Sequence, residues 1–236
     1  MDFSGRVVLV TGGTGYLGSA VCKAFRDARD DVVAVYLFQK ELPYFRKILS
    51  ARAKEVALER ADVSRPGEMD RVVAKVLRRH GRIDVLVNTV GGFMASPVDD
   101  TSSEDFEAAM ALNLKSAFLS CKAVIPAMRR RKRGKIVSVS SQASLLGEAE
   151  SFLYSASKSG INRLTEALAA ELKDVNVQVN CIMPSVMDTP ANRKAMPDAG
   201  FSKWVKTDQA AQIILWLCSE AADPISGASI PVYGRM

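Results

Sequence analysis

The sequence predicts an α/β fold, in which helices flank a doubly wound parallel sheet of about seven strands. Two observations support this prediction: apolar β-branched runs alternate with helical patterns along almost the whole chain, and the runs are apolar on both faces. Ligands of such sheets bind beyond the carboxyl ends of the strands, where the strand order reverses. The junctions between strands and helices are therefore the places to look for chemistry.

Each element follows from a local pattern. Seven apolar runs are predicted as strands: 6–11, 31–38, 56–60, 83–88, 135–140, 175–181 and 229–232. Five stretches with helical periodicity are predicted as helices: 15–28, 66–80, 103–131, 154–172 and 209–219. Pro66 suits a first helical turn, and Pro126 predicts a kink or a late turn in the long helical region. No linker interrupts the 236 residues, so we expect a single domain over 1–236.

Composition excludes several classes of protein. At 48% hydrophobic and 25% charged residues the chain is typical of globular proteins rather than disordered or collagen-like ones. No apolar run reaches the roughly 18 residues of a membrane span, and the N-terminus lacks a signal-peptide core. We therefore expect a cytoplasmic protein with no membrane partner. The four cysteines are scattered through apolar stretches and are expected to be buried thiols.

The net charge of +6 comes from one segment. Residues 129–135 hold six basic side chains, and without them the remaining 26 basic residues balance 26 acidic ones. Such a run suits the negative end of a helix dipole, and no nucleic-acid-binding motif accompanies it. We expect no nucleic-acid partner, although a phosphate-rich partner for this run stays open. With His80 as the only histidine, no metal site is expected.

A glycine-rich turn follows the first strand, Thr11-Gly12-Gly13-Thr14-Gly15-Tyr16-Leu17-Gly18. Glycines let a pyrophosphate approach the backbone, and a helix N-terminus offers free N–H groups to it. In this strand–turn–helix setting the turn predicts a Rossmann-like dinucleotide site. The residues expected to bind the cofactor here are Gly12, Thr14, Gly15, Tyr16, Leu17 and Gly18.

The end of the second strand reports on the cofactor's ribose. A carboxylate near this point binds a 2′-hydroxyl, whereas an arginine accepts a 2′-phosphate. The strand ends in Val35-Tyr36-Leu37-Phe38, which supplies neither, while Lys40 and Arg46 lie nearby. The sequence thus favours NADP(H) over NAD(H) without deciding between them, with Tyr36 expected in the site.

A third pattern points to acid–base chemistry. Tyr154 and Lys158 are four residues apart, on one face of a predicted helix. A lysine ammonium beside a phenol favours the phenolate, so we expect Lys158 to lower the pKa of Tyr154 and to suit it to proton transfer. Ser141 ends the fifth strand, where its hydroxyl can hydrogen-bond a substrate oxygen.

Together these motifs resemble those of the short-chain dehydrogenase/reductase family, over nearly the whole chain. The resemblance implies that Tyr154 is the acid/base, Lys158 holds the nicotinamide ribose, Ser141 orients the carbonyl and Asn113 keeps a proton relay. It also implies further cofactor contacts, and homodimers or homotetramers of this chain. The implied contacts are Asp62, Val63, Asn88, Gly91, Pro184 and Thr189.

Three departures qualify the resemblance. Position 16 is Tyr where the single-domain branch usually has Gly, and Asn88-Thr89-Val90-Gly91 replaces Asn-Asn-Ala-Gly. Pro184-Ser185 replaces Pro-Gly, and the substrate loop, about residues 184–206, resembles that of dihydropteridine reductases. That subgroup lacks the catalytic serine, which this chain has as Ser141.

We therefore expect an NAD(P)H-dependent oxidoreductase that transfers hydride between nicotinamide and a small carbonyl or alcohol substrate. Two alternatives are kept. One is a dihydropteridine-type reductase. The other is a non-catalytic cofactor-binding subunit or redox sensor, which the altered glycine turn alone supports. Apolar loop residues, with Phe93 and Met94 as a wall opposite, suggest a partly hydrophobic or planar substrate.

Overall fold

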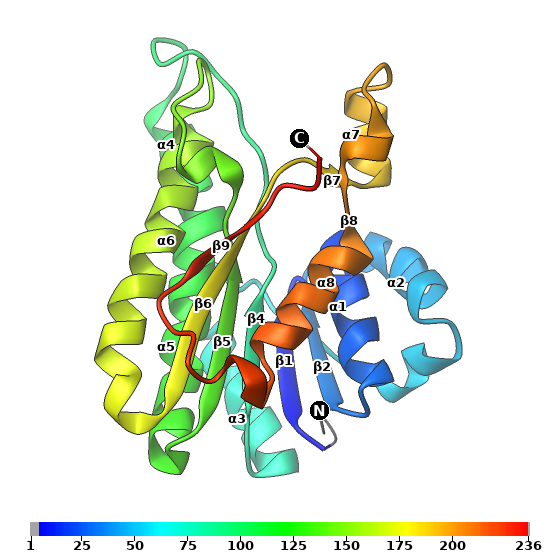
Figure 1. The fold of residues 1–236 in the computed structure, drawn as a ribbon, viewed down its shortest axis with the longest axis vertical. Helices are drawn as coiled ribbons and strands as arrows, with labels where there is room; N and C mark the ends of the chain where they lie inside the picture. The colour runs from blue at the N-terminus through cyan, green and yellow to red at the C-terminus, as the bar shows by residue number, and fades with distance from the viewer. Residues whose placement is uncertain (1–4, 236) are drawn as a thin grey trace.

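Seven strands form one parallel sheet in the order β3-β2-β1-β4-β5-β6-β9 in the computed structural model, which describes residues 5–235 (Figure 1). Their bounds are β1 Val7–Thr11, β2 Asp31–Tyr36, β3 Ala57–Arg60, β4 Val85–Asn88, β5 Gly134–Val139, β6 Val177–Pro184 and β9 Ser229–Val232. The chain runs outward from β1 to β3, then returns to the other side of β1 with β4. The strand order therefore reverses between β1 and β4, and the predicted fold class is confirmed.

Helices cover both faces of the sheet (Figure 1). One face carries α1 (Tyr16–Asp27), α2 (Leu42–Leu49) and α8 (Thr207–Leu217). The other face carries α3 (Glu68–His80), α5 (Ser116–Arg131) and α6 (Phe152–Leu172), with α4 (Ser103–Met110) packed on α6. Beyond the carboxyl ends of the strands, α7 (Pro190–Ala195) is held by the small pair β7 (Met187–Asp188) and β8 (Val205–Lys206).

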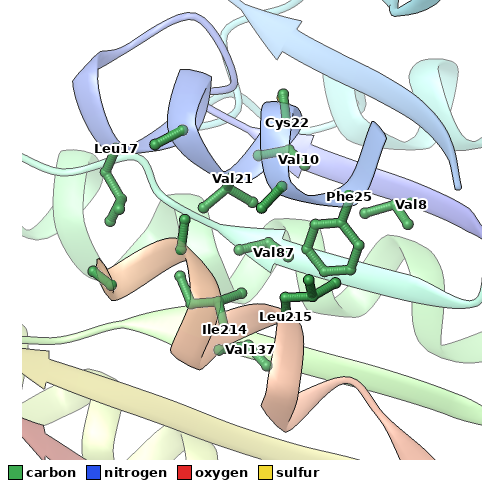
Figure 2. Close-up of a cluster of buried hydrophobic side chains, with 14 of the residues drawn as sticks. Val8, Val10, Leu17, Val21, Cys22, Phe25, Val87, Val137, Ile214 and Leu215 are labelled. Carbon is green, nitrogen blue, oxygen red and sulfur yellow. The ribbon is translucent and has the colours of Figure 1, made fainter. Parts of the chain in front are cut away.

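Alternation along β1 divides the core between the two faces. Val8 and Val10 belong to the cluster under α1 and α8, where Phe25 and Leu215 pack (Figure 2). Val7 and Leu9 belong to the opposite cluster, under α3, α5 and α6. Because successive side chains of a strand point to opposite faces, an apolar run buries both sheet faces. The four cysteines are buried and free, as predicted.

The long helical region breaks at a different place from the one predicted. A π-helical turn, Ala111–Lys115, separates α4 from α5, and Pro126 lies inside α5. The turn brings Asn113 to the backbone of Gly92, whose N–H and C=O both bond its side chain. These tertiary hydrogen bonds determine where the long helix breaks, and the local sequence pattern does not predict them. Helices α2 and α7, with the β7–β8 pair, were also absent from the predicted elements.

By length and composition alone, the span Ser103–Arg131 could cross a membrane. In the structure it is divided by the π turn, and α5 packs against α3, β4 and β5. A helix in the core of a sheet protein can have the same length and apolar composition as a membrane span.

The basic segment is engaged in ion pairs at the amino edge of the sheet. Arg131 and Arg82 both pair with Asp84, whose side chain is only 6% exposed and also accepts the N–H of Val7. The other pairs are Arg129 with Glu171, Arg133 with Glu220, and Lys135 with Asp223. Arg129, Arg130 and Arg131 form the last turn of α5, as the sequence predicts.

Asp84→Ala is expected to lower the free energy of unfolding by about 3 kcal/mol, because it leaves two guanidinium groups and a buried N–H without their acceptor. Urea denaturation measures the change. The control is Glu220→Ala, which breaks an exposed pair and should cost less than about 1 kcal/mol. Equal losses for the two variants would contradict the role given to Asp84.

Candidate functional site

The glycine-rich turn between β1 and α1 requires its last glycine. A Cβ added to Gly18 would lie 2.1 Å from the carbonyl oxygen of Gly12, closer than real atoms approach. This contact folds the turn tightly against the first turn of α1, which begins at Tyr16. The turn therefore brings bare backbone to the carboxyl edge of the sheet, the feature that a pyrophosphate needs.

A cleft of about 200 Å³ opens beside this turn, where the strand order reverses. It is bounded by the turn after β1, the end of β2 and the segments that follow β3 and β4. Six of the predicted cofactor residues line it: Gly12, Gly15, Tyr36, Asp62, Val63 and Gly91. The glycine backbone of the cleft and its place at the reversal of strand order are those of a dinucleotide site.

Three other residues of the turn have structural contacts of their own. The Thr14 hydroxyl donates a hydrogen bond to the carboxylate of Glu41. The Tyr16 ring meets that of Tyr44 edge-to-face, with centroids 4.8 Å apart. Leu17 is buried in the core. The departure at position 16 is thus accommodated by packing on α2, a helix that the sequence analysis did not predict.

The remaining predicted cofactor residues lie outside the lining of the cleft. Asn88 is buried and donates a hydrogen bond to the Ser138 hydroxyl, 3.1 Å away, which ties β4 to β5. Pro184 ends β6. The Thr189 side chain caps α7 by accepting the N–H of Asn192.

A second constellation forms where β5 meets α6. Ser141 lies two residues beyond the end of β5, and Tyr154 and Lys158 lie one helical turn apart near the start of α6. The Lys158 ammonium donates to the carbonyl of Val139 at 2.9 Å and lies 5.7 Å from the centroid of the Tyr154 ring. The Ser141 side chain lies near enough to the Tyr154 hydroxyl to lower the pKa of the phenol by hydrogen bonding.

Asn113 joins this constellation from the π turn. Its Oδ1 accepts the N–H of Gly92 at 3.0 Å, and its Nδ2 donates to the Gly92 carbonyl at 3.1 Å. A Cβ on Gly91 would lie 2.7 Å from Asn113 Oδ1 and 2.8 Å from Lys158 Nζ. Gly91 therefore fills the space between two side chains while it also lines the cleft. The structure brings the four predicted catalytic residues together beside the cleft.

Burial is the largest influence on the pKa values of Lys158 and Tyr154. It lowers the pKa of Lys158 from 10.5 to about 8. It also raises the pKa of Tyr154, and the hydrogen bond with Ser141 offsets this only in part. The expected lowering of the Tyr154 pKa is thus wrong for this structure. The Lys158 ammonium is directed to the Val139 carbonyl, and desolvation of the phenol is the largest influence on the Tyr154 pKa.

One apolar ring packs on Tyr154, and two exposed leucines lie in the segment that follows Ser141. The rings of Phe93 and Tyr154 meet nearly edge-to-face, with centroids 5.2 Å apart. Phe93, Leu145 and Leu146 are all more than half exposed. Exposed apolar groups beside a polar constellation are typical of a ligand site rather than of ordinary surface.

Two features of the site escaped the sequence analysis. Glu41 lines the cleft, although it comes after the predicted strand in a segment that was given no structure. The cleft is also lined by Phe38, Ser64, Thr89, Val90 and Leu112. Only Glu41 carried a usable signal, as a carboxylate five residues beyond Tyr36.

Comparison with known proteins gives the family. The model of the short chain dehydrogenase family matches residues 6–200. This chain belongs to the short-chain dehydrogenase family. It is 30% identical to 3-oxoacyl-(acyl-carrier-protein) reductase FabG of Thermotoga maritima, over 100% of this chain and 99% of that protein.

Other members show the same likeness. The chain is 31% identical to 3beta-hydroxysteroid dehydrogenase 1 of Eggerthella lenta, over 100% of this chain and 95% of that protein. A solved structure of ElxO with NADP bound superimposes with a TM-score of 0.90 at 24% identity, over 98% of both chains. As a short-chain dehydrogenase the protein is an oxidoreductase of CH–OH and C=O groups, with a nicotinamide cofactor.

Lys158→Met is expected to raise the free energy of unfolding at pH 7 by about 2 kcal/mol. Folding lowers the Lys158 pKa from 10.5 to about 8, which costs about 3 kcal/mol at neutral pH, and losing the bond to Val139 returns about 1 kcal/mol of that. Chemical denaturation at constant ionic strength measures the difference.

The pH dependence of the stability difference between wild type and Lys158→Met shows whether the buried charge causes it. Above pH 8 the folded protein releases the Lys158 proton, whereas the unfolded chain keeps it up to pH 10.5. The wild type therefore gains stability relative to Lys158→Met as the pH rises from 8 to 10.5, and the gap should close. Lys23→Met, at an exposed lysine, is the control. A gap unchanged at pH 10 would show that repacking, rather than a buried charge, separates the two proteins.

Proposed function

We propose that this protein is a nicotinamide-dependent carbonyl reductase, working reversibly as an alcohol dehydrogenase, with Tyr154 as its acid/base. The observation that carries the proposal is the meeting of Ser141, Tyr154, Lys158 and Asn113 beside a cleft that shares Gly91 with them. When bound in the cleft, the cofactor supplies or accepts the hydride at the substrate carbon.

Each group of the chain has a separate task. Tyr154, whose pKa is raised by burial, is a protonated phenol at neutral pH and donates its proton to the substrate oxygen during reduction. The Ser141 hydroxyl holds that oxygen. Lys158 is positioned by Val139 to meet the cofactor's ribose and to pass protons to Tyr154. Asn113 holds the Gly91–Gly92 backbone beside Lys158 and supports the proton relay.

The cofactor is held by the turn and the cleft. We assign its pyrophosphate to Gly12, Gly15 and the first turn of α1, and its adenosine half to Tyr36 and Asp62-Val63. The sequence favours NADP(H) on the strength of Lys40 and Arg46, neither of which lines the cleft. ElxO binds NADP, but at 24% identity that likeness shows the fold alone. The preference between NADP(H) and NAD(H) therefore depends on which side chains of the cleft face the adenosine ribose.

The substrate is proposed to be apolar or planar near its carbonyl group. Phe93 packs on Tyr154, and we assign the exposed Leu145 and Leu146 to the same apolar wall of the substrate site. Two relatives are named for an acyl-chain and a steroid substrate, and both of these are largely apolar.

A dihydropteridine-type reductase is the second candidate. It is favoured by the segment from Asp188 to Pro197, which forms α7 over the carboxyl edge of the sheet. Such an enzyme uses Tyr154 and Lys158 without the serine. A non-catalytic subunit is less well supported, because Tyr16 leaves the close contact of Gly12 and Gly18 intact.

We also propose that the protein is a homodimer or homotetramer. Phe106 of α4 and Phe118 of α5 are each 45% exposed, which favours helix packing between copies. Sedimentation of the purified protein tests this proposal, and a monomer at micromolar concentration would refute it.

Tyr154→Phe is expected to lower kcat for carbonyl reduction by at least about 100-fold, because the hydroxyl assigned to give the proton is lost. Binding of reduced cofactor should stay within about threefold of wild type, since the phenol hydroxyl alone is removed. Consumption of reduced cofactor against a carbonyl panel, with a separate binding titration, measures both. Near-normal turnover would refute the assignment.

Ser141→Ala separates the two candidate enzymes. In a carbonyl reductase the loss of the hydroxyl that holds the substrate oxygen should lower kcat about 100-fold, with little change in cofactor binding. A dihydropteridine-type reductase should tolerate the change. Wild type and Ser141→Ala are assayed with ketones and with a quinonoid dihydropterin. Loss of activity in Ser141→Ala identifies a carbonyl reductase, and unchanged activity identifies a dihydropteridine-type reductase.

Phe93→Ala is expected to raise KM for cyclic and aromatic ketones roughly tenfold, and for small aliphatic ketones much less, because a large apolar wall is lost. The control is Trp216→Ala, which removes an exposed aromatic side chain from the surface of α8. Equal effects of Phe93→Ala on both ketone classes would show that Phe93 acts on Tyr154 rather than on the substrate.

A further inference from the structure

The segment after β2 is docked on the glycine-rich turn. A short 3₁₀ turn, Gln39–Glu41, leads into α2, and two contacts join this segment to the turn. The Thr14 hydroxyl donates to the Glu41 carboxylate, and the ring of Tyr44 packs on that of Tyr16. Thr14 is completely buried, so its hydroxyl is a fixed donor. Glu41 is thereby held at the wall of the cofactor cleft, which it lines together with Tyr36 and Phe38.

In the described part of the chain, the charged side chains that line this cleft are all acidic. Among the described residues that line it are two carboxylates, Glu41 and Asp62, and no lysine or arginine. Lys40, the nearest basic neighbour in sequence, places its ammonium 5.2 Å from the centroid of the exposed Phe38 ring. Arg46 is exposed on α2. The two cations that favoured NADP(H) in the sequence are therefore not part of the wall.

Of the two carboxylates, Glu41 keeps its charge for a ligand. Asp62 accepts two hydrogen bonds from Ser64, at 3.1 Å from the N–H and 2.6 Å from the hydroxyl, and its other oxygen pairs with Arg65 at 3.2 Å. Its charge is thus compensated where it stands. The bond that Glu41 receives from Thr14 is neutral, so it orients the carboxylate without cancelling its charge.

A carboxylate at the ribose side of such a cleft acts on the 2′-position of the cofactor. It accepts a hydrogen bond from a 2′-hydroxyl, whereas it repels a 2′-phosphate, which carries between one and two negative charges at neutral pH. We propose that Glu41, oriented by Thr14, makes this protein selective for NAD(H) over NADP(H). The proposal rests on the proposed function and reverses the preference favoured by the sequence.

Fluorescence titration with NADH and NADPH, at low ionic strength and without carbonyl substrate, tests the proposal. Wild type is expected to bind NADH at least about tenfold more tightly than NADPH. Glu41→Gln keeps an acceptor for Thr14 and should tighten NADPH binding roughly tenfold, while NADH binding changes less than about threefold. Glu41→Lys should favour NADPH outright.

Glu55→Gln is the matched control. It removes the same charge from a carboxylate that pairs with Arg26 and Arg52, outside the cleft, and should leave the ratio of the two affinities unchanged. Thermal melting verifies that each variant is folded. Tighter binding of NADPH by wild type, or the same ratio in Glu41→Gln and Glu55→Gln, would overturn the proposal and leave the proposed function standing. Binding of neither dinucleotide would overturn both.

Discussion

A buried ammonium group at the end of β5 fixes the geometry on which the site depends. Lys158 is 4% exposed, and it donates to the Val139 carbonyl while its own carbonyl accepts the Ser140 hydroxyl. These two bonds lock the first turns of α6 against β5. Tyr154 is thereby placed beside Ser141, two residues beyond the end of the strand. Desolvation makes the arrangement costly, because burial disfavours the charged lysine, so the geometry that suits catalysis is not the most stable one.

The opposite side of the constellation depends on a break in a helix. The π turn at Ala111–Lys115 allows Asn113 to bond both backbone groups of Gly92, which fixes the chain after β4. Gly91 then fits between Asn113 and Lys158, where any side chain would collide. The backbone of one loop thus joins the catalytic constellation to the cofactor cleft, and Phe93, two residues further on, reaches Tyr154.

The sequence predicts what depends on local pattern. All seven strands, the glycine-rich turn and the shared helical face of Tyr154 and Lys158 follow from periodicity and spacing. Each was found, with strand ends displaced by up to three residues. The π turn, helix α2 and the place of Glu41 depend on contacts between distant segments. The direction of the Tyr154 pKa was missed for a similar reason, because it depends on burial, which spacing does not report.

The features that follow from local pattern and those that depend on distant contacts also differ in the role we assign to them. The groups to which we assign proton transfer lie just beyond a strand end and on one helix, whose positions the parallel sheet dictates. The groups to which we assign ligand selection, Glu41 and Phe93, lie on connecting segments held by a few hydrogen bonds and ring contacts. Segments of that kind change without disturbing the sheet. Relatives about 30% identical to this chain can therefore keep one reaction and differ in substrate, as the acyl and steroid enzymes do.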